Sequence, residues 1–135
     1  MYEDTLLQLS KDTQFRISEP ISSPLSERRN PACGDEVSLS ADLRHGKIEK
    51  LSFHAQGCAV CVASSTALSI HLNGCDLETA RTRINQAMDF FNSDSTTEWR
   101  ADWGAPDLPA LGAVRARPMR MHCVKLPWLA LQDAL

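Results

Sequence analysis

The sequence predicts an α+β fold in which a small antiparallel sheet of about three strands is covered by helices on one face. Two observations lead to this prediction: an alternating apolar pattern around a turn over residues 37–55, and helical patterns over residues 59–91. The chain has 135 residues, of which 43% are apolar. This size and composition suit one domain spanning residues 1–135, with a core of its own.

The central part of the sequence predicts a β-hairpin. Apolar and polar residues alternate over residues 37–44, which is typical of a half-buried strand. Residues 45–47, His-Gly-Lys, form a turn, and residues 48–55 return with apolar residues on one face. Two alternating runs joined by a glycine-containing turn predict neighbouring antiparallel strands.

Three segments are predicted to be helical. Residues 2–10 have the leucines of a short amphipathic helix, and residues 59–72 have a helical composition. Asn73-Gly74 then supplies a left-handed C-cap. Asp76 is placed to cap a helix over residues 77–91, whose apolar residues fall on one stripe.

The remaining segments are richer in proline and less regular. Residues 17–32 contain three prolines and four serines, which predicts an extended, partly mobile connection within the domain. Residues 92–118 are irregular, apart from a short helix expected at 107–111. Pro127 is expected in the first turn of a last helix over residues 127–134, because its missing N–H has little cost there.

Composition and charge limit the classes of partner. The net charge of −3 gives no electrostatic reason to expect nucleic acid or an anionic membrane. No apolar run approaches the roughly 18 residues that a membrane span needs. The N-terminal residues MYEDTLLQLSKD do not resemble a secretory signal. We therefore expect a cytoplasmic protein whose five cysteines are reduced, and clustered reduced cysteines are typical of metal ligands or reactive thiols.

Three cysteines stand at informative positions. Cys33 enters the first predicted strand, Cys58 lies where a strand meets a helix, and Cys123 precedes the last predicted helix. Each has a second donor nearby, namely Asp35, Cys61 or His122. Thiolates with a carboxylate or an imidazole suit zinc or iron–sulfur chemistry. The N–H groups of a helix N-terminus also favour a thiolate at Cys58, and Arg120 is placed to add positive charge near Cys123.

Other cysteines and aromatic residues have simpler interpretations. Cys75, in a turn between helices, is expected to be a small buried residue. Cys61 forms C-x-x-C with Cys58, and packing in the core and a role at the site are about equally supported. The remaining histidines are expected at the surface or in packing. The tryptophans are expected in core or rim packing. These residues are His45, His54, His71, Trp99, Trp103 and Trp128.

These motifs resemble the U-type iron–sulfur assembly proteins: IscU, SufU and the N-terminal domain of NifU. The resemblance lies in N-P-A-C-G-D at residues 30–35, Gly-Cys at 57–58, the small residues AVCVASSTAL that follow, and the late Cys123. It covers residues 30–135 and implies a SufE/NifU-like fold. IscU members carry Leu-Pro-Pro-Val-Lys before the last cysteine, whereas this chain has DLPALGAVRARPMRMHC, similar to the SufU branch.

The resemblance implies a site made of Cys33, Asp35, Cys58 and Cys123. In SufU-like proteins this set binds zinc, and the protein accepts sulfur from a pyridoxal-phosphate cysteine desulfurase of the SufS or IscS type. Cys33 is the expected acceptor of persulfide sulfur. In IscU-like proteins the same set supports iron or a transient [2Fe–2S] cluster, which is passed to downstream assembly proteins or apoproteins.

Three functions follow as hypotheses: a zinc-containing sulfur-transfer protein, a cluster scaffold, and a structural zinc module that only stabilises its fold. The first two predict a carrier or scaffold, not an enzyme that turns over a small molecule. His122 stands where IscU-type members have histidine and SufU-type members commonly do not, and Cys61 stands where neither branch is expected to have cysteine. We expect both to be auxiliary residues, like Arg120. The adjacent side chains of His122 and Cys123 diverge in regular backbone. Cys61 lies a full turn, about 4.5 Å, further along its helix than Cys58, so the helix-end residue Cys58 is favoured as the direct ligand.

Overall fold

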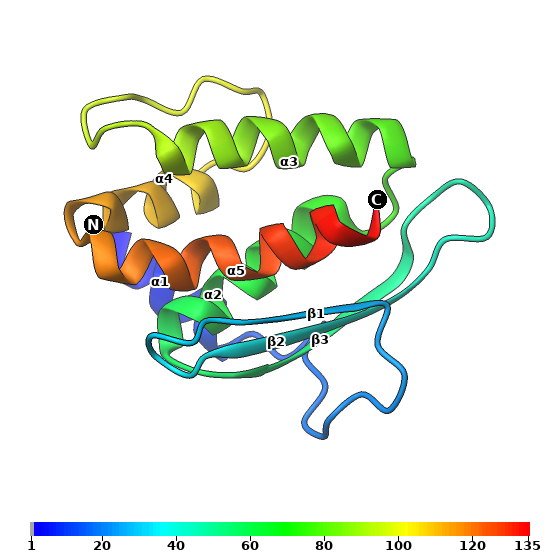
Figure 1. Ribbon diagram of the computed structural model, residues 1–135. Coiled ribbons are helices and arrows are strands. Elements are labelled where there is room, and N and C mark those ends of the chain that lie inside the picture. Colours follow the sequence, from blue (N-terminus) through cyan, green and yellow to red (C-terminus); the bar gives the residue numbers. More distant parts are fainter. Residues whose placement is uncertain (1) are drawn as a thin grey trace.

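The computed structural model describes residues 2–135; Met1, included in the predicted domain, lies outside the described residues. Its centre is an antiparallel sheet of strands β1 (Ser26–Arg29), β2 (Glu36–Asp42) and β3 (Glu49–Gln56), in the order β1-β2-β3. Helices cover one face of this sheet (Figure 1). The predicted α+β fold is therefore confirmed.

Strand β1 was not predicted, because it lies inside the segment 17–32 that was expected to be a mobile connection. It pairs with β2 from Ser26 opposite Leu39 to Arg29 opposite Glu36. Its sequence, SERR, is largely exposed, so it lacks the apolar alternation that marks a strand. The preceding segment is also tied to the sheet, since the backbone N–H of Leu25 donates to the carbonyl oxygen of Leu39 at 2.8 Å.

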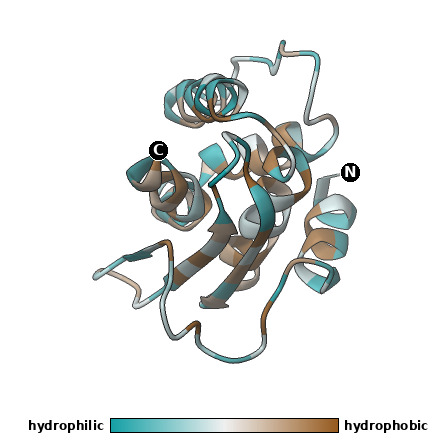
Figure 2. Cartoon of the chain, turned by 90° about the vertical axis from the view of Figure 1, so that its right-hand side faces the viewer, coloured by the Kyte–Doolittle hydropathy of each residue, from teal (hydrophilic) through white to brown (hydrophobic). Residues whose placement is uncertain are grey.

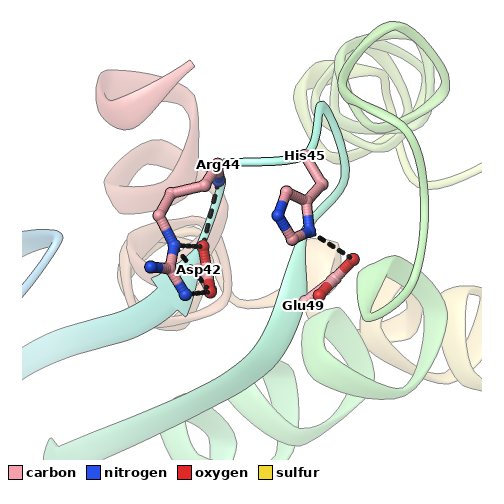
Figure 3. Close-up of polar contacts among 4 residues, drawn as sticks. All are labelled: Asp42, Arg44, His45 and Glu49. Carbon is pink, nitrogen blue, oxygen red and sulfur yellow. Dashed lines mark hydrogen bonds and ion pairs between the residues drawn. The ribbon is translucent and has the colours of Figure 1, made fainter.

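The turn between β2 and β3 confirms the predicted hairpin. Gly46 has a φ of +72°, a conformation that glycine adopts without steric cost. Arg44 donates hydrogen bonds to Asp42 at 2.7–3.1 Å, and His45 lies 3.9 Å from the carboxylate of Glu49 (Figure 3). These contacts lie at the surface of the turn.

The first three helices agree with the prediction. They are α1 (Tyr2–Lys11), α2 (Ala59–Leu72) and α3 (Leu77–Asn92). Asp76 caps α3 by accepting a hydrogen bond from the backbone N–H of Thr79 at 2.7 Å. Helix α2 is buried on almost all sides and consists mostly of small residues, which let it approach its neighbours closely.

The C-terminal part contains α4 (Asp107–Gly112), a 3₁₀ turn η1 (Ala113–Ala116) and α5 (Pro118–Ala134). The prediction that the last helix begins at Pro127 was wrong. Pro118 occupies the first turn instead, and Pro127 lies inside the helix, where it cannot donate to the preceding turn. Packing of α5 against α2, α3 and the sheet outweighs this lost hydrogen bond.

The core lies between the sheet and helices α2 and α5. The inward residues of the strands, among them Val37, Leu39 and Phe53, are fully buried. Helix α3 packs on α5 and forms an outer layer (Figure 1). In Figure 2, apolar residues, drawn in brown, occur both on the strands of the sheet and on the helices packed against it. None of the helices within residues 2–135 is long and apolar enough to cross a membrane.

A buried serine connects the two central helices. Ser64 of α2 donates its hydroxyl to the carbonyl oxygen of Val124 at 2.5 Å and accepts a hydrogen bond from the indole N–H of Trp128 at 2.9 Å. Val124 follows Cys123 directly. These bonds therefore fix the part of α5 that carries Cys123 against α2.

Candidate metal centre

Cys33 lies at the tip of the loop between β1 and β2, and its side chain is exposed. The loop is closed by hydrogen bonds from the Asn30 N–H to the Asp35 carbonyl oxygen and from the Gly34 N–H to the Asn30 carbonyl oxygen, both 2.8 Å long. The side chain of Asn30 also accepts from the N–H of Ala32 at 3.1 Å. Gly34 has a φ of +77° and so permits this tight turn. The loop presents Cys33 to solvent on a defined backbone.

Asp35 ends this loop and is buried, with 5% of its surface exposed. It lies against Gly57, the residue between β3 and Cys58. A Cβ atom at Gly57 would lie 2.6 Å from both Cγ and Oδ1 of Asp35. Gly57 is therefore the residue that leaves space for the Asp35 carboxylate.

Cys58 is the N-cap residue of α2 and has an extended backbone conformation, with φ −71° and ψ 165°. Its side chain caps none of the helix N–H groups. Instead its thiol points to Asp35, with the sulfur 3.6 Å from Oδ2. The carboxylate of Asp35 thus connects the β1–β2 loop with the start of α2.

Cys123 lies in the second turn of α5 and is buried, with 3% of its surface exposed. The sequence placed it before the last helix, but it lies within that helix. Its sulfur is 3.9 Å from the sulfur of Cys33. Three elements that are distant in sequence therefore meet at one place: the β1–β2 loop, the start of α2 and the first half of α5.

Among the described residues, Cys33, Asp35 and Cys123 each offer a ligand atom within 4.8 Å of the others. Cys58 adjoins this group through its contact with Asp35. Two or three thiolates with one carboxylate match the donors that zinc and other soft or borderline cations prefer.

The electrostatics of the site also suit a cation. Burial raises the pKa of the Cys123 thiol, and interactions with Asp35 and Cys58 raise it further. A thiolate at Cys123 is unfavourable beside these acidic groups. A bound cation reverses this effect because it stabilises all of the negative charges together. The donor set therefore fits a metal ion.

Cys61 is fully buried in the first turn of α2. Its pKa is raised to about 12, mainly by burial and then by the negative charges of Asp35, Cys58 and Cys33. Cys61 thus lies beside the site and beneath its surface, and it is not one of the three residues whose ligand atoms converge.

His122 and Arg120 lie on the same helix as Cys123 but differ from it in burial. Both are exposed. Because α5 is regular here, the side chains of His122 and Cys123 leave the helix about 100° apart. His122 is absent from the convergent group of described residues.

Two features of the site were missed from the sequence. Gly57 was interpreted only as the end of a strand, whereas it makes room for Asp35. Ser64 was interpreted only as part of a helix, whereas it holds α5 near Cys123. Both contacts join residues that are distant in sequence, so no local pattern signals them.

The family model described as the NifU-like N terminal domain matches residues 12–99 of this chain. The matched residues include Cys33, Asp35 and Cys58, and they end before Cys123.

Curated relatives carry two kinds of name. The chain is 29% identical over 109 residues to the zinc-dependent sulfurtransferase SufU of Bacillus subtilis, covering 81% of this chain and 72% of the relative. It is 23% identical over 135 residues to the iron–sulfur cluster assembly scaffold protein IscU of Thermotoga maritima, covering 100% of this chain and 92% of the relative.

Solved structures agree in fold. A SUF-system scaffold protein for iron–sulfur cluster assembly from Fervidobacterium islandicum superposes with a TM-score of 0.81 at 25% identity, covering 96% of this chain and 93% of that one. The N-terminal part of a NifU-like protein from Brucella abortus has the same TM-score, 0.81, at 16% identity, covering 98% and 90%. At this identity the second likeness concerns the fold alone.

Proposed function

The chain belongs to the NifU-like N terminal domain family, and from that membership we propose that it acts in iron–sulfur cluster assembly as a zinc-containing sulfur-transfer protein. It accepts persulfide sulfur from a pyridoxal-phosphate cysteine desulfurase and passes it to downstream assembly proteins or apoproteins. Cys33 is the acceptor. Cys58, Cys123 and Asp35 remain as ligands.

The observation that carries this proposal is the difference in exposure among the convergent donors. Cys33 is exposed, while Cys123 and Asp35 are buried within 4.8 Å of it. An incoming persulfide therefore reaches Cys33 first. The buried donors are suited to hold a metal while Cys33 reacts.

The transfer is a thiol exchange. The Cys33 thiolate attacks the outer sulfur of the donor persulfide, a new S–S bond forms on Cys33, and the donor cysteine leaves as a thiolate. No net oxidation occurs, because one S–S bond replaces another. The closed loop of residues 30–35 presents the Cys33 sulfur outward for this attack.

A zinc ion held by these residues would keep the thiols deprotonated at neutral pH. Asp35 has a distinct role in such a set. Its carboxylate is a harder ligand than thiolate and exchanges more readily. Its contacts with Gly57 and Cys58 hold it in place when Cys33 is occupied with sulfur.

The second candidate is a scaffold on which a transient [2Fe–2S] cluster is assembled as cargo. The relatives named IscU support it, since one of them matches the whole length of this chain. The third candidate, a structural zinc module, is less well supported. The fold has an extensive apolar core, so a metal is not its only source of stability. In a structural zinc site the ligands form a closed tetrahedral set, whereas Cys33 is exposed.

Metal content separates these candidates. We expect protein purified without added metal to contain about one zinc per chain and to be colourless, because a tetrahedral set of three thiolates and one carboxylate suits zinc. A brown protein whose absorption bands persist through gel filtration would favour the scaffold. A metal-free protein that folds normally and resists zinc titration would contradict both metal proposals.

Sulfur transfer is tested by Cys33→Ser. This variant should lose the stimulation of a cysteine desulfurase, measured as alanine formation, while its circular dichroism is unchanged. Cys75→Ser is the matched control, because Cys75 lies away from the site, bonded to the His71 carbonyl oxygen. Equal stimulation by both variants would contradict the acceptor role of Cys33.

A further inference from the structure

Cys61 adds a fourth thiol beside the three cysteines of the candidate site. It is three residues after Cys58, and the two occupy the N-cap and third positions of α2. On a helix, side chains three residues apart are neighbours, with Cβ atoms about 5–6 Å apart. The two thiols therefore lie on one side of the first turn.

The local backbone suits a bond between these two sulfurs. A disulfide needs Cβ atoms about 3.5–4.5 Å apart, slightly closer than in a regular helix. Cys58 has extended backbone angles and no capping bond, so its side chain can turn toward Cys61 without breaking a helical hydrogen bond. Cys58 is half-buried and Cys61 fully buried, so an oxidant from solvent reaches Cys58 before Cys61.

We propose that Cys58 and Cys61 form a reversible redox pair that protects the site from peroxides. Hydrogen peroxide or an organic peroxide oxidises the Cys58 thiolate to a sulfenic acid, and the peroxide O–O bond is reduced to water or an alcohol. The Cys61 thiol then attacks the Cys58 sulfur, a disulfide forms, and the hydroxyl leaves as water. Overall, two thiols lose two electrons and the peroxide gains them.

The surroundings of Cys58 show why Cys61 matters. Cys58 also contacts the Asp35 carboxylate, which cannot resolve a sulfenic acid, and the thiol of Cys123. Cys123, the other buried thiol, has its sulfur 3.9 Å from Cys33 and so has a neighbour of its own. Without Cys61, only the Cys123 thiol, which is also paired with Cys33, can resolve an oxidised Cys58, so more of it is expected to proceed to sulfinic acid, which thiols do not reduce.

This inference depends on the proposed function only in its consequence, the release of metal. Cys58 cannot be both a disulfide partner and a thiolate ligand. Peroxide should therefore release metal, and dithiothreitol should restore binding. The disulfide itself requires neither a desulfurase nor sulfur transfer, so the two proposals can fail separately.

The test is peptide mapping after treatment of the purified protein with one equivalent of hydrogen peroxide, with metal release followed in parallel. Trypsin places Cys58 and Cys61 together on residues 51–81, whereas Cys33 and Cys123 fall on residues 30–44 and 121–125. Cys75 shares the first peptide, so all proteins carry Cys75→Ser. We expect a disulfide within residues 51–81 that dithiothreitol removes.

Cys61→Ala is compared in the same background, with Cys61→Ser as a second variant in case the smaller side chain disturbs the core. Both should show several-fold more sulfinic acid at Cys58 and incomplete recovery of metal binding. Three results would overturn the proposal: Cys58 linked to Cys33 or Cys123 in the parent protein, equal sulfinic acid with and without Cys61, or no oxidation product at Cys58.

Discussion

Two regions of this molecule differ in whether their acidic and basic side chains have partners of opposite character. In the thiol site, made of Cys33, Asp35, Cys58 and Cys123, acidic groups converge, and the pKa of Cys123 is raised by its neighbours and by burial. In the aromatic region, which comprises helix α4, η1 and residues 90–106, Arg115 and Asp107 are each bonded to complementary partners.

Arg115 is the clearest example in the aromatic region. Its guanidinium donates to the carbonyl oxygens of Gly112, Asp94 and Thr97 and to the hydroxyl of Ser93, at 2.6–2.8 Å. The same group lies over the ring of Phe90, 4.2 Å from its centroid.

A second pair in that region has the same character. His71 and Asp107 form a partly buried contact of 2.8 Å between α2 and α4, and the histidine ring lies 5.8 Å from that of Trp103. The tryptophans pack against the core or lie within it, as predicted. The comparison indicates that the aromatic region maintains the fold, whereas the thiol site gathers donors that suit a cation.

The largest expected effect comes from removing one of the retained cysteine ligands. Cys123→Ser or Cys58→Ser should weaken zinc binding by more than about 100-fold, since even residues that only support a ligand contribute 10–100-fold. Competition with a chromogenic chelator measures this. Cys61→Ser should bind almost as well as the unmodified protein, and a loss as large as in Cys58→Ser would show that the ligand set is wrong.

Gly57→Ala tests whether space for Asp35 controls the site. The added methyl would meet the Asp35 carboxylate at 2.6 Å and displace it, so metal affinity should fall about 10–100-fold. Asp35→Ala should produce a similar loss. Because both changes act through one carboxylate, the double variant should be no worse than either alone. Additive losses would contradict this mechanism.

In the aromatic region, replacing a side chain that makes several hydrogen bonds should lower the stability of the fold and leave metal binding intact. Arg115→Met removes several charge-assisted hydrogen bonds of a partly exposed group, and the free energy of unfolding should fall by about 1–2 kcal/mol. Urea denaturation measures this, with Arg100→Met as an exposed control. A marked change in zinc affinity for Arg115→Met would break the distinction between the two regions.

The smallest effect is expected at the exposed hairpin. Hydrogen bonds from Arg44 lower the pKa of Asp42, so any stability from this pair is present above the ordinary carboxyl pKa of about 3.9 and is lost as the pH falls below it. Because both side chains are screened by water, Arg44→Ala should leave the urea midpoint at pH 7 unchanged. A clear shift would show that this turn stabilises the sheet.

The sequence predicted those elements whose own pattern is regular. Strands β2 and β3 and helices α2 and α3 follow from local periodicity and capping residues such as Asp76. Strand β1 could not be predicted in this way, because SERR is exposed and is ordered by pairing with β2. The start of α5 was misplaced because Pro127 is tolerated inside a helix that is packed on several sides.

The site was predictable in its residues but not in its geometry. The motifs around Cys33, Cys58 and Cys123 singled out the donors by resemblance to a known family. The order of exposure, the contact between Gly57 and Asp35, and the position of Cys61 depend on how distant segments pack. Local sequence patterns carry no information on such contacts.

The central claim, that Cys33 is the exposed acceptor of a site whose other donors are retained, is tested most directly by mapping the persulfide. The protein is mixed with a cysteine desulfurase and one equivalent of cysteine, quenched after a single turnover and digested with trypsin. We expect an additional sulfur atom on residues 30–44, the peptide that contains Cys33. Sulfur on the peptide of Cys58 or Cys123, with Cys33 unmodified, would contradict it.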